Sequence, residues 1–195
     1  MNAALPSHLR RVVTDGSDRG EWMRARSRGI TATDVAKLST PRSIDAAAWE
    51  KLHGSSFTGN AFTRHGTQRA PVIAAWVLRE HGIEPSRALF HAETDMRHLA
   101  TPDGLVLREA GRLELAEIKT TNKAWRTIPR NYLRQIWWQQ YVLGAERTLM
   151  VWERHENFVP VGDPECRWVD RDENEIAKLV GLAGKLIDTL YARTK

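Results

Sequence analysis

The sequence has few of the features that mark secreted, membrane-bound or disulfide-stabilised proteins. It contains one cysteine, Cys166, so an internal disulfide framework is excluded and a reducing cytoplasm is the expected compartment. Its first residues include no apolar segment typical of a signal peptide, and no apolar run is long enough to cross a membrane. We therefore expect a cytoplasmic protein with no membrane partner.

Motifs for common cofactors are also missing. The sequence has no P-loop or dinucleotide fingerprint, its seven histidines show no zinc-ligand spacing, and it has no internal repeat. What is present is a chain of 195 residues, 42% hydrophobic and 27% charged, which suits one globular domain with its own core. We expect residues 1–195 to form a single domain.

The order of the predicted elements indicates an α/β fold in which helices flank a mixed central sheet. Helices are predicted at 20–27, 33–39, 44–53, 68–81, 129–143 and 172–193, and strands at 87–92, 97–101, 105–107, 113–119, 148–153, 158–161 and 167–169. Thr31 and Asp34 have the spacing of a helix capping box. We expect residues 1–19 to be a flexible arm and residues 54–67 to be a loop.

Two short motifs carry the strongest chemical signal. Asp103 lies in a Pro-Asp-Gly turn, and fourteen residues later Glu117 and Lys119 end an apolar run. In a strand, residues two apart point to the same face, so Glu117 and Lys119 should lie together with Asp103 nearby. Two carboxylates suit Mg²⁺ (or Mn²⁺), and a lysine beside them can orient the nucleophile in phosphodiester hydrolysis.

Each of these residues also has a purely structural interpretation. Pro-Asp-Gly is a common turn sequence, and Glu117 and Lys119 alone are typical of a surface pair on a strand. The segment after them adds weight, because residues 119–145 contain basic side chains and no acid. Such a stretch suits a polyanion, although a solvated helix face explains it as well. Its basic residues are Lys119, Lys123, Arg126, Arg130 and Arg134.

Two tryptophans in this segment, Trp137 and Trp138, are adjacent on the predicted helix and so face about 100° apart. We expect one of them in the core, while the other could stack on a nucleic-acid base.

Four segments share their order with a known family: Trp22 to Thr33, Ala100 to Gly104, Leu115 to Lys119 and Tyr132 to Trp138. Together they resemble the lambda exonuclease and YqaJ-like viral recombinase family of the PD-(D/E)XK nuclease superfamily, over residues 20–153. The resemblance implies a restriction-endonuclease-like core and a metal-dependent DNA nuclease. The expected activity is 5′–3′ exonuclease action on linear duplex DNA, in recombination or repair.

The resemblance also implies roles for individual residues. Asp103, Glu117 and the backbone carbonyl of Ile118 would bind Mg²⁺ or Mn²⁺, Lys119 would orient or deprotonate the attacking water, and Gln135 would help to order the site. Arg26 and Thr33 would hold the 5′-terminal phosphate of DNA, with a plain helix charge and a plain N-cap as their alternatives. The implied partners are a duplex DNA end, its single-strand product and a single-strand annealing protein, and a homo-oligomer is compatible with the family.

One departure from the family pattern puts activity in doubt. The family carries a metal-binding Glu four residues after a glycine; here the glycine is Gly66 and the expected Glu position holds Ala70. The chain could be an engineered inactive variant, a naturally degenerate protein that only binds DNA, or one in which another acid takes the role. Candidates for that acid are Glu80, Glu93 and Asp95. The alternatives to an exonuclease are therefore a catalytically silent DNA-binding or adaptor protein on the same fold, and a structure-specific endonuclease.

Overall fold

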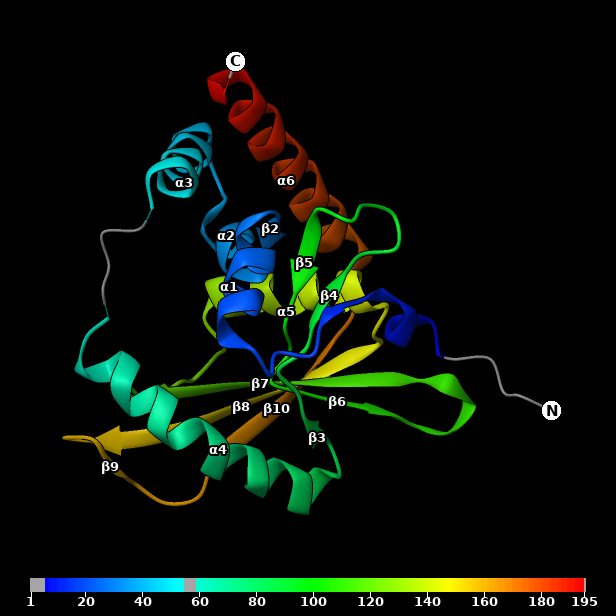
Figure 1. Ribbon diagram of the computed structural model, residues 1–195. Coiled ribbons are helices and arrows are strands. Elements are labelled where there is room, and N and C mark those ends of the chain that lie inside the picture. The colour runs from blue at the N-terminus through cyan, green and yellow to red at the C-terminus, as the bar shows by residue number, and fades with distance from the viewer. Residues whose placement is uncertain (1–5, 55–58, 195) are drawn as a thin grey trace.

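A computed structural model of the protein describes residues 6–54 and 59–194, and Figure 1 shows their arrangement. The helices are α1 (Arg19–Ser27), α2 (Ala32–Lys37), α3 (Pro41–His53), α4 (Ala61–His81), α5 (Arg130–Leu143) and α6 (Glu173–Thr194), with 3-10 helices η1 (Ser7–Arg11) and η2 (Glu109–Gly111). The strands are β1 (Val12–Thr14), β2 (Ile30–Thr31), β3 (Glu84–Pro85), β4 (Leu89–His91), β5 (His98–Ala100), β6 (Gly104–Leu107), β7 (Leu113–Thr121), β8 (Arg147–Glu156), β9 (Val159–Pro160) and β10 (Glu165–Asp170).

The strands form two mixed sheets. The larger sheet has the order β10-β8-β7-β6-β3, with β9 paired to β8, and the smaller has the order β1-β4-β5-β2. In the larger sheet β7 runs parallel to β8, and β6 and β7 form the predicted antiparallel hairpin. The mixed sheet flanked by helices that the sequence predicts is therefore confirmed.

Alternation along β7 and β8 divides the core into two layers. Leu115 and Met150 belong to the core layer between the sheet and α5, whereas Ile118 and Val151 belong to the layer under α4. The two helices lie on opposite sides of the larger sheet (Figure 1). Both faces of these central strands are thus buried, as expected of a parallel pair with helices on each side. None of the helices in the described part of the chain is long and apolar enough to cross a lipid bilayer.

The flexible arm predicted at residues 1–19 is wrong for the described residues 6–19. Here β1 pairs with β4, and the Arg11 guanidinium donates hydrogen bonds to the carbonyls of Val142 and, at 3.1 Å, of Leu143. These carbonyls belong to the last turn of α5 and have no partner within that helix, so a buried arginine stabilises them. Residues 1–5 lie outside the described residues.

The loop predicted at 54–67 is wrong from Ala61 onward, where α4 begins; residues 55–58 lie outside the described residues. Asn60 caps this helix by accepting a hydrogen bond from the Thr63 amide at 3.0 Å. Tertiary contact stabilises the polar first turns, because the ring centroids of His65 and His155 lie 4.4 Å apart in the interior. Local composition could not reveal this contact.

Both tryptophans of α5 are buried, so the expectation that one could stack on a base is wrong. Trp138 is 0% exposed and donates a hydrogen bond to the Leu99 carbonyl at 3.0 Å, and Trp137 is 7% exposed. Helix α5 lies between the larger sheet and α6, so two adjacent positions both meet the core.

Candidate active site

The turn before β6 brings Asp103 to β7. The Asp103 amide donates to the Ala116 carbonyl at 3.1 Å, and one Asp103 carboxylate oxygen accepts a hydrogen bond from the Ile118 amide at 2.7 Å. Gly104 is required here, because a Cβ at that position would lie 3.0 Å from the Glu84 carbonyl oxygen. The hairpin therefore fixes the carboxylate beside the middle of β7.

Glu117 and Lys119 lie on the face of β7 that meets α5. The Lys119 ammonium forms an ion pair with one carboxylate oxygen of Glu117 and lies 5.4 Å from the centre of the Tyr132 ring. The other Glu117 oxygen accepts a hydrogen bond from the Gln139 side-chain amide at 2.8 Å. Glu117 is only 4% exposed, so these contacts compensate a buried charge.

Gln139 is a site residue that the sequence interpretation did not single out. The residue expected to order the site was Gln135, which lines the same cavity but whose side chain makes no hydrogen bond to another described residue. Gln139 lies one helical turn after Gln135, and residues four apart share a helix face. That spacing was the available signal.

The electrostatics of the cluster reflect burial and like charge. Burial, together with the nearby Glu117 carboxylate, raises the pKa of Asp103 to about 7. Burial alone would lower the pKa of Lys119, but the Glu117 and Asp103 carboxylates outweigh it and raise that pKa above its usual value. The Lys119 ammonium therefore compensates the negative charge of two carboxylates, those of Asp103 and Glu117, only in part.

A cavity of about 240 Å³ opens over this cluster. Its lining joins elements far apart in the sequence. The residues are Trp22, Arg26, Thr31, Ala32, Thr33, Leu89, Ala100, Thr101, Asp103, Glu117, Lys119, Gln135 and Gln139. The two predicted metal-binding carboxylates, Asp103 and Glu117, thus face the same cavity as the predicted phosphate-binding pair, Arg26 and Thr33.

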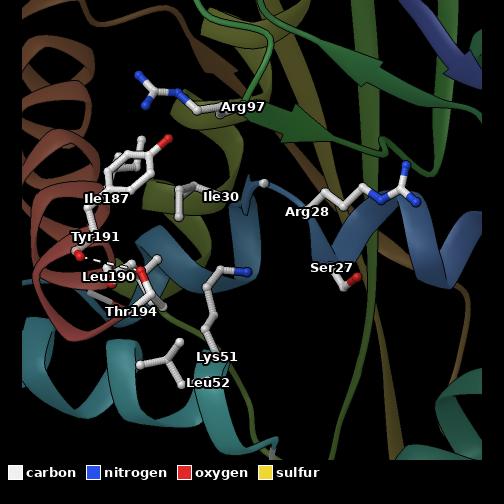
Figure 2. A pocket seen from close by; sticks show the side chains of 11 residues that line it. Ser27, Arg28, Ile30, Lys51, Leu52, Arg97, Ile187, Leu190, Tyr191 and Thr194 are labelled. Atoms are coloured by element: carbon white, nitrogen blue, oxygen red, sulfur yellow. Dashed lines mark hydrogen bonds between the residues drawn. The ribbon is translucent and has the colours of Figure 1, made fainter.

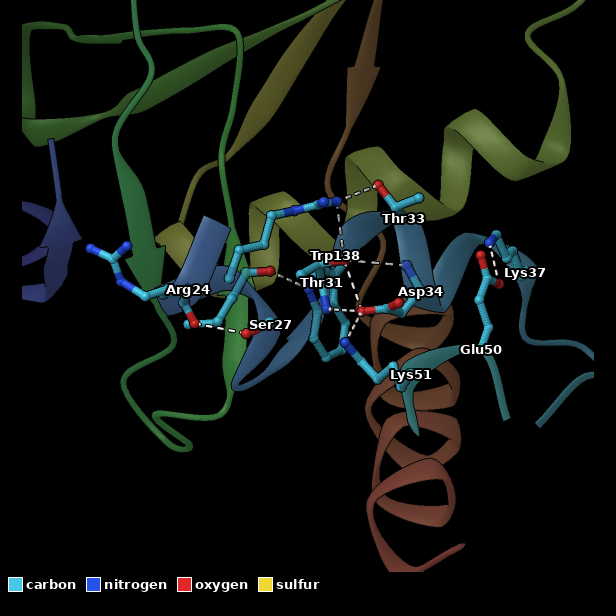
Figure 3. Close-up of polar contacts among 11 residues, drawn as sticks. Arg24, Ser27, Thr31, Thr33, Asp34, Lys37, Glu50, Lys51 and Trp138 are labelled. Carbon is cyan, nitrogen blue, oxygen red and sulfur yellow. Dashed lines mark hydrogen bonds and ion pairs between the residues drawn. The ribbon is translucent and has the colours of Figure 1, made fainter. Parts of the chain in front are cut away.

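Arg26 is held in place by a polar network around the start of α2 (Figure 3). Its guanidinium donates to the Thr33 hydroxyl at 3.0 Å and contacts the Thr31 hydroxyl at 3.5 Å. Asp34 accepts from the Thr31 amide at 2.7 Å, which completes the predicted capping box, and forms an ion pair with Lys51 at 3.0 Å. The network presents a partly buried guanidinium and a hydroxyl at the cavity wall.

Ala70 lies beside the site, at the position where the family pattern places a Glu. It lines a second cavity, of about 640 Å³, together with Asp103 and Ile118. Its neighbour Arg69 forms a bidentate ion pair with Glu153 on β8, at 2.6 and 2.8 Å, which fastens α4 to the sheet. Helix α4 is therefore held beside the site at the position of the expected third ligand, but the alanine at residue 70 has no side-chain oxygen to bind a metal.

The structure places no substitute acid at Ala70. Glu80, Glu93 and Asp95 line neither of the two cavities. Glu80 forms an ion pair with Arg79, and Asp95 forms one with Arg97, each at 2.7 Å. In the described parts of the chain no group of three His, Cys, Asp or Glu side chains is arranged to hold a metal ion.

The basic residues after Lys119 are spread over the surface rather than gathered at the cavity. Lys123 and Arg126 are exposed. Arg130 forms an ion pair with Glu175 of α6 at 3.1 Å, and Arg134 donates to the Ala36 carbonyl at 3.2 Å. None of these four lines the 240 Å³ cavity, so a role in DNA binding stays a prediction.

A further cavity, of about 290 Å³, lies between α1, α3 and α6 and is separate from the cluster (Figure 2). Lys51, Arg97 and Tyr191 line it with several aliphatic side chains, and no carboxylate takes part. It therefore lacks the groups needed for metal-dependent hydrolysis.

The donor set at the cluster fits a hard divalent cation. Asp103 and Glu117 offer carboxylate oxygens, the ligand type that Mg²⁺ and Mn²⁺ prefer, and the raised pKa of Asp103 reflects negative charge that a cation would compensate. With Ala70 in place of an acid, the cluster offers two carboxylates, and the Ile118 carbonyl stays a predicted ligand.

Comparisons with known proteins concern the family and the fold. A family model for the YqaJ-like viral recombinase domain matches residues 21–146. The crystal structure of an alkaline exonuclease from Laribacter hongkongensis is similar with a TM-score of 0.71 and 24% sequence identity, over 89% of this chain and 93% of that chain. A phage-related exonuclease from Haemophilus somnus 129PT matches with a TM-score of 0.61 and 13% identity, over 86% and 96% of the two chains. No curated protein matches the sequence significantly.

Proposed function

Because the chain belongs to the YqaJ-like viral recombinase family, we propose that it is a divalent-metal-dependent DNA exonuclease. It would degrade linear duplex DNA in the 5′–3′ direction during recombination or repair. The observation that carries the proposal is the convergence of Asp103, Glu117 and Lys119 with Arg26 and Thr33 on one cavity. A single-strand annealing protein and a homo-oligomer remain predicted partners.

Each of these residues has a task in hydrolysis. Asp103, Glu117 and the Ile118 carbonyl would hold Mg²⁺ or Mn²⁺, which supplies an activated water and neutralises charge on the phosphate when bound. Lys119, fixed by its ion pair with Glu117, would orient the water towards phosphorus. Gln139 keeps Glu117 in position through its hydrogen bond.

Arg26 and Thr33 would hold the 5′-terminal phosphate at the other end of the cavity. A guanidinium offers a planar fork of donors that matches phosphate, and Thr33 adds a hydroxyl beside the N-terminus of α2. With the terminal phosphate bound there, the next phosphodiester would face Asp103 and Glu117. Terminal-phosphate binding of this kind favours an exonuclease over an endonuclease.

Turnover by this chain should be weak, because Ala70 provides no oxygen ligand. The test is Ala70→Glu, assayed with Mn²⁺ on linear duplex DNA. We expect restored or faster cleavage, whereas Ala75→Glu, on an exposed part of the same helix, should leave activity at the wild-type level. If Ala70→Glu leaves cleavage unchanged while DNA binding persists, the weakened-nuclease hypothesis is wrong.

The same alanine favours a second candidate function, a catalytically silent DNA-binding protein on this fold. That protein would bind DNA equally well after Asp103→Ala or Lys119→Ala and would cleave nothing with glutamate at position 70. An endonuclease is distinguished separately, because it would cut circular DNA as readily as linear DNA.

A further inference from the structure

The cavity beside Ala70 adjoins the active-site cavity. The two share Trp22, Thr101 and Asp103 as lining residues, so Asp103 is accessible from both. The shared wall is fixed, since the Trp22 indole donates a hydrogen bond to the Thr101 hydroxyl at 3.3 Å. Asp103 therefore faces a cavity on each of two sides, and the proposed phosphate-binding residues Arg26 and Thr33 lie on one of them.

Two arginines from separate segments line the second cavity. Arg19 begins α1 and Arg87 lies between β3 and β4; both are exposed, and within residues 6–54 and 59–194 neither has an ion-pair partner. Their segments are locked together at Gly16, where φ is +78° and a Cβ would lie 2.3 Å from the Arg87 carbonyl oxygen. This close backbone contact holds the segments that carry Arg19 and Arg87 beside the same cavity.

The remaining walls suit a nucleic-acid strand. Ala70, Pro71 and Ala74 of α4 supply an apolar surface, and Asp103 is the sole acid among the residues that line this cavity. Guanidinium groups contact phosphates, while small apolar side chains accommodate sugars and bases.

We propose that this second cavity receives the DNA strand on the 3′ side of the scissile phosphate, with Arg19 and Arg87 contacting its backbone. The proposal rests on the proposed function. A strand whose 5′-phosphate is held by Arg26 and whose first phosphodiester faces Asp103 must continue past Asp103. The second cavity is the adjoining space, and two positively charged side chains that line it, Arg19 and Arg87, have no ion-pair partner among the described residues.

The test compares two DNA probes that would occupy different parts of this path. A 5′-mononucleotide, deoxyadenosine monophosphate, would fill the first cavity only, whereas a 5′-phosphorylated 12-nucleotide single strand would extend into the second. Binding of each is measured without divalent metal, so that nothing is cleaved, between 50 and 200 mM salt. The proteins are wild type, Arg19→Gln/Arg87→Gln, and a control with the same change in charge, Arg112→Gln/Arg167→Gln, at exposed arginines outside both cavities.

We expect the Arg19→Gln/Arg87→Gln variant to bind the 12-nucleotide strand about fivefold to tenfold more weakly than wild type at 0.1 M salt. The slope of log affinity against log salt should fall by about 1.4, because each lost phosphate contact on a single strand removes about 0.7. Mononucleotide affinity and the melting temperature should stay at their wild-type values, and the control variant should match wild type with both probes.

Two results would overturn the proposal. One is equal affinity of the Arg19→Gln/Arg87→Gln variant and the control variant for the strand; the other is an equal loss for strand and mononucleotide, which would place the arginines at the first cavity. Either can occur while wild type binds both probes, and the proposed function then survives. A wild-type protein that binds neither probe would refute the proposed function and the strand path together.

Discussion

Replacing Gln139 with methionine tests whether the amide of α5 sets the geometry of the metal-binding carboxylate. Gln139 is 3% exposed, and its side-chain amide donates to Glu117 at 2.8 Å. Methionine has a similar length and fills the same space without a donor. The change therefore removes one hydrogen bond to a buried charge and leaves the packing nearly intact.

The size of the effect follows from that bond. A hydrogen bond to a charged group contributes about 1.5–3 kcal/mol, and since 1.4 kcal/mol is a factor of ten, metal affinity should fall roughly 10- to 100-fold. Fold stability should change less. Among the described residues the side-chain oxygen of Gln139 is buried without a hydrogen-bond partner, so methionine also removes an uncompensated polar atom.

The neighbouring residue provides a matched control. Gln140 is 0% exposed and donates to the Thr148 hydroxyl at 3.1 Å and to the Val169 carbonyl at 2.9 Å, away from the cluster. Gln140→Met should therefore lower the free energy of unfolding by about 1–3 kcal/mol but leave metal affinity unchanged. Calorimetric titration with Mn²⁺ and urea unfolding measure the two quantities. Equal Mn²⁺ affinity in wild type and Gln139→Met would refute the positioning role.

Two further predictions concern stability. Arg69→Met should lower the free energy of unfolding in urea by about 3 kcal/mol, because Glu153, with a 3% exposed side chain, would remain as an unpaired buried carboxylate. The double variant Arg69→Met/Glu153→Met should recover most of that loss. An unchanged free energy of unfolding in Arg69→Met would contradict the reasoning. Burial, with His65 nearby, lowers the pKa of His155 below 6.5, so the unfolded chain takes up the proton first and stability should fall as pH drops below 6.5. Because Glu153 opposes this shift only partly, His155→Phe should flatten the pH dependence between 8 and 5.5 in thermal melts, and an unchanged dependence would exclude His155 as its source.

The hairpin that carries the site could be predicted because its signals are local. The turn at Asp103 and Gly104 and the alternation through Glu117 and Lys119 each depend on neighbours within a few residues. Period-two alternation alone fixes which side chains share a face. Glu117, Lys119 and the strand that carries them could therefore be predicted from the sequence.

What the sequence did not predict depends on contacts between distant segments. The N-terminal segment looked like an arm because its ordering comes from Arg11, which binds carbonyls more than 130 residues away. The first turns of α4 looked like a loop because their stability comes from His65 packing on His155. Neither interaction leaves a pattern in the local sequence.

The energetic state of the cluster favours a weakened nuclease over a protein that only binds DNA. A binding surface needs exposed positive charge, yet this chain keeps Glu117 at 4% exposure and holds Asp103 with a pKa raised to about 7 by burial and by Glu117. Such an arrangement costs stability unless a cation or a proton compensates it. Loss of selection for catalysis would remove that cost first, for instance by replacing Glu117 with a neutral residue. Here Asp103, Glu117 and Lys119 are all retained, and the one expected ligand that is missing is the acid at Ala70.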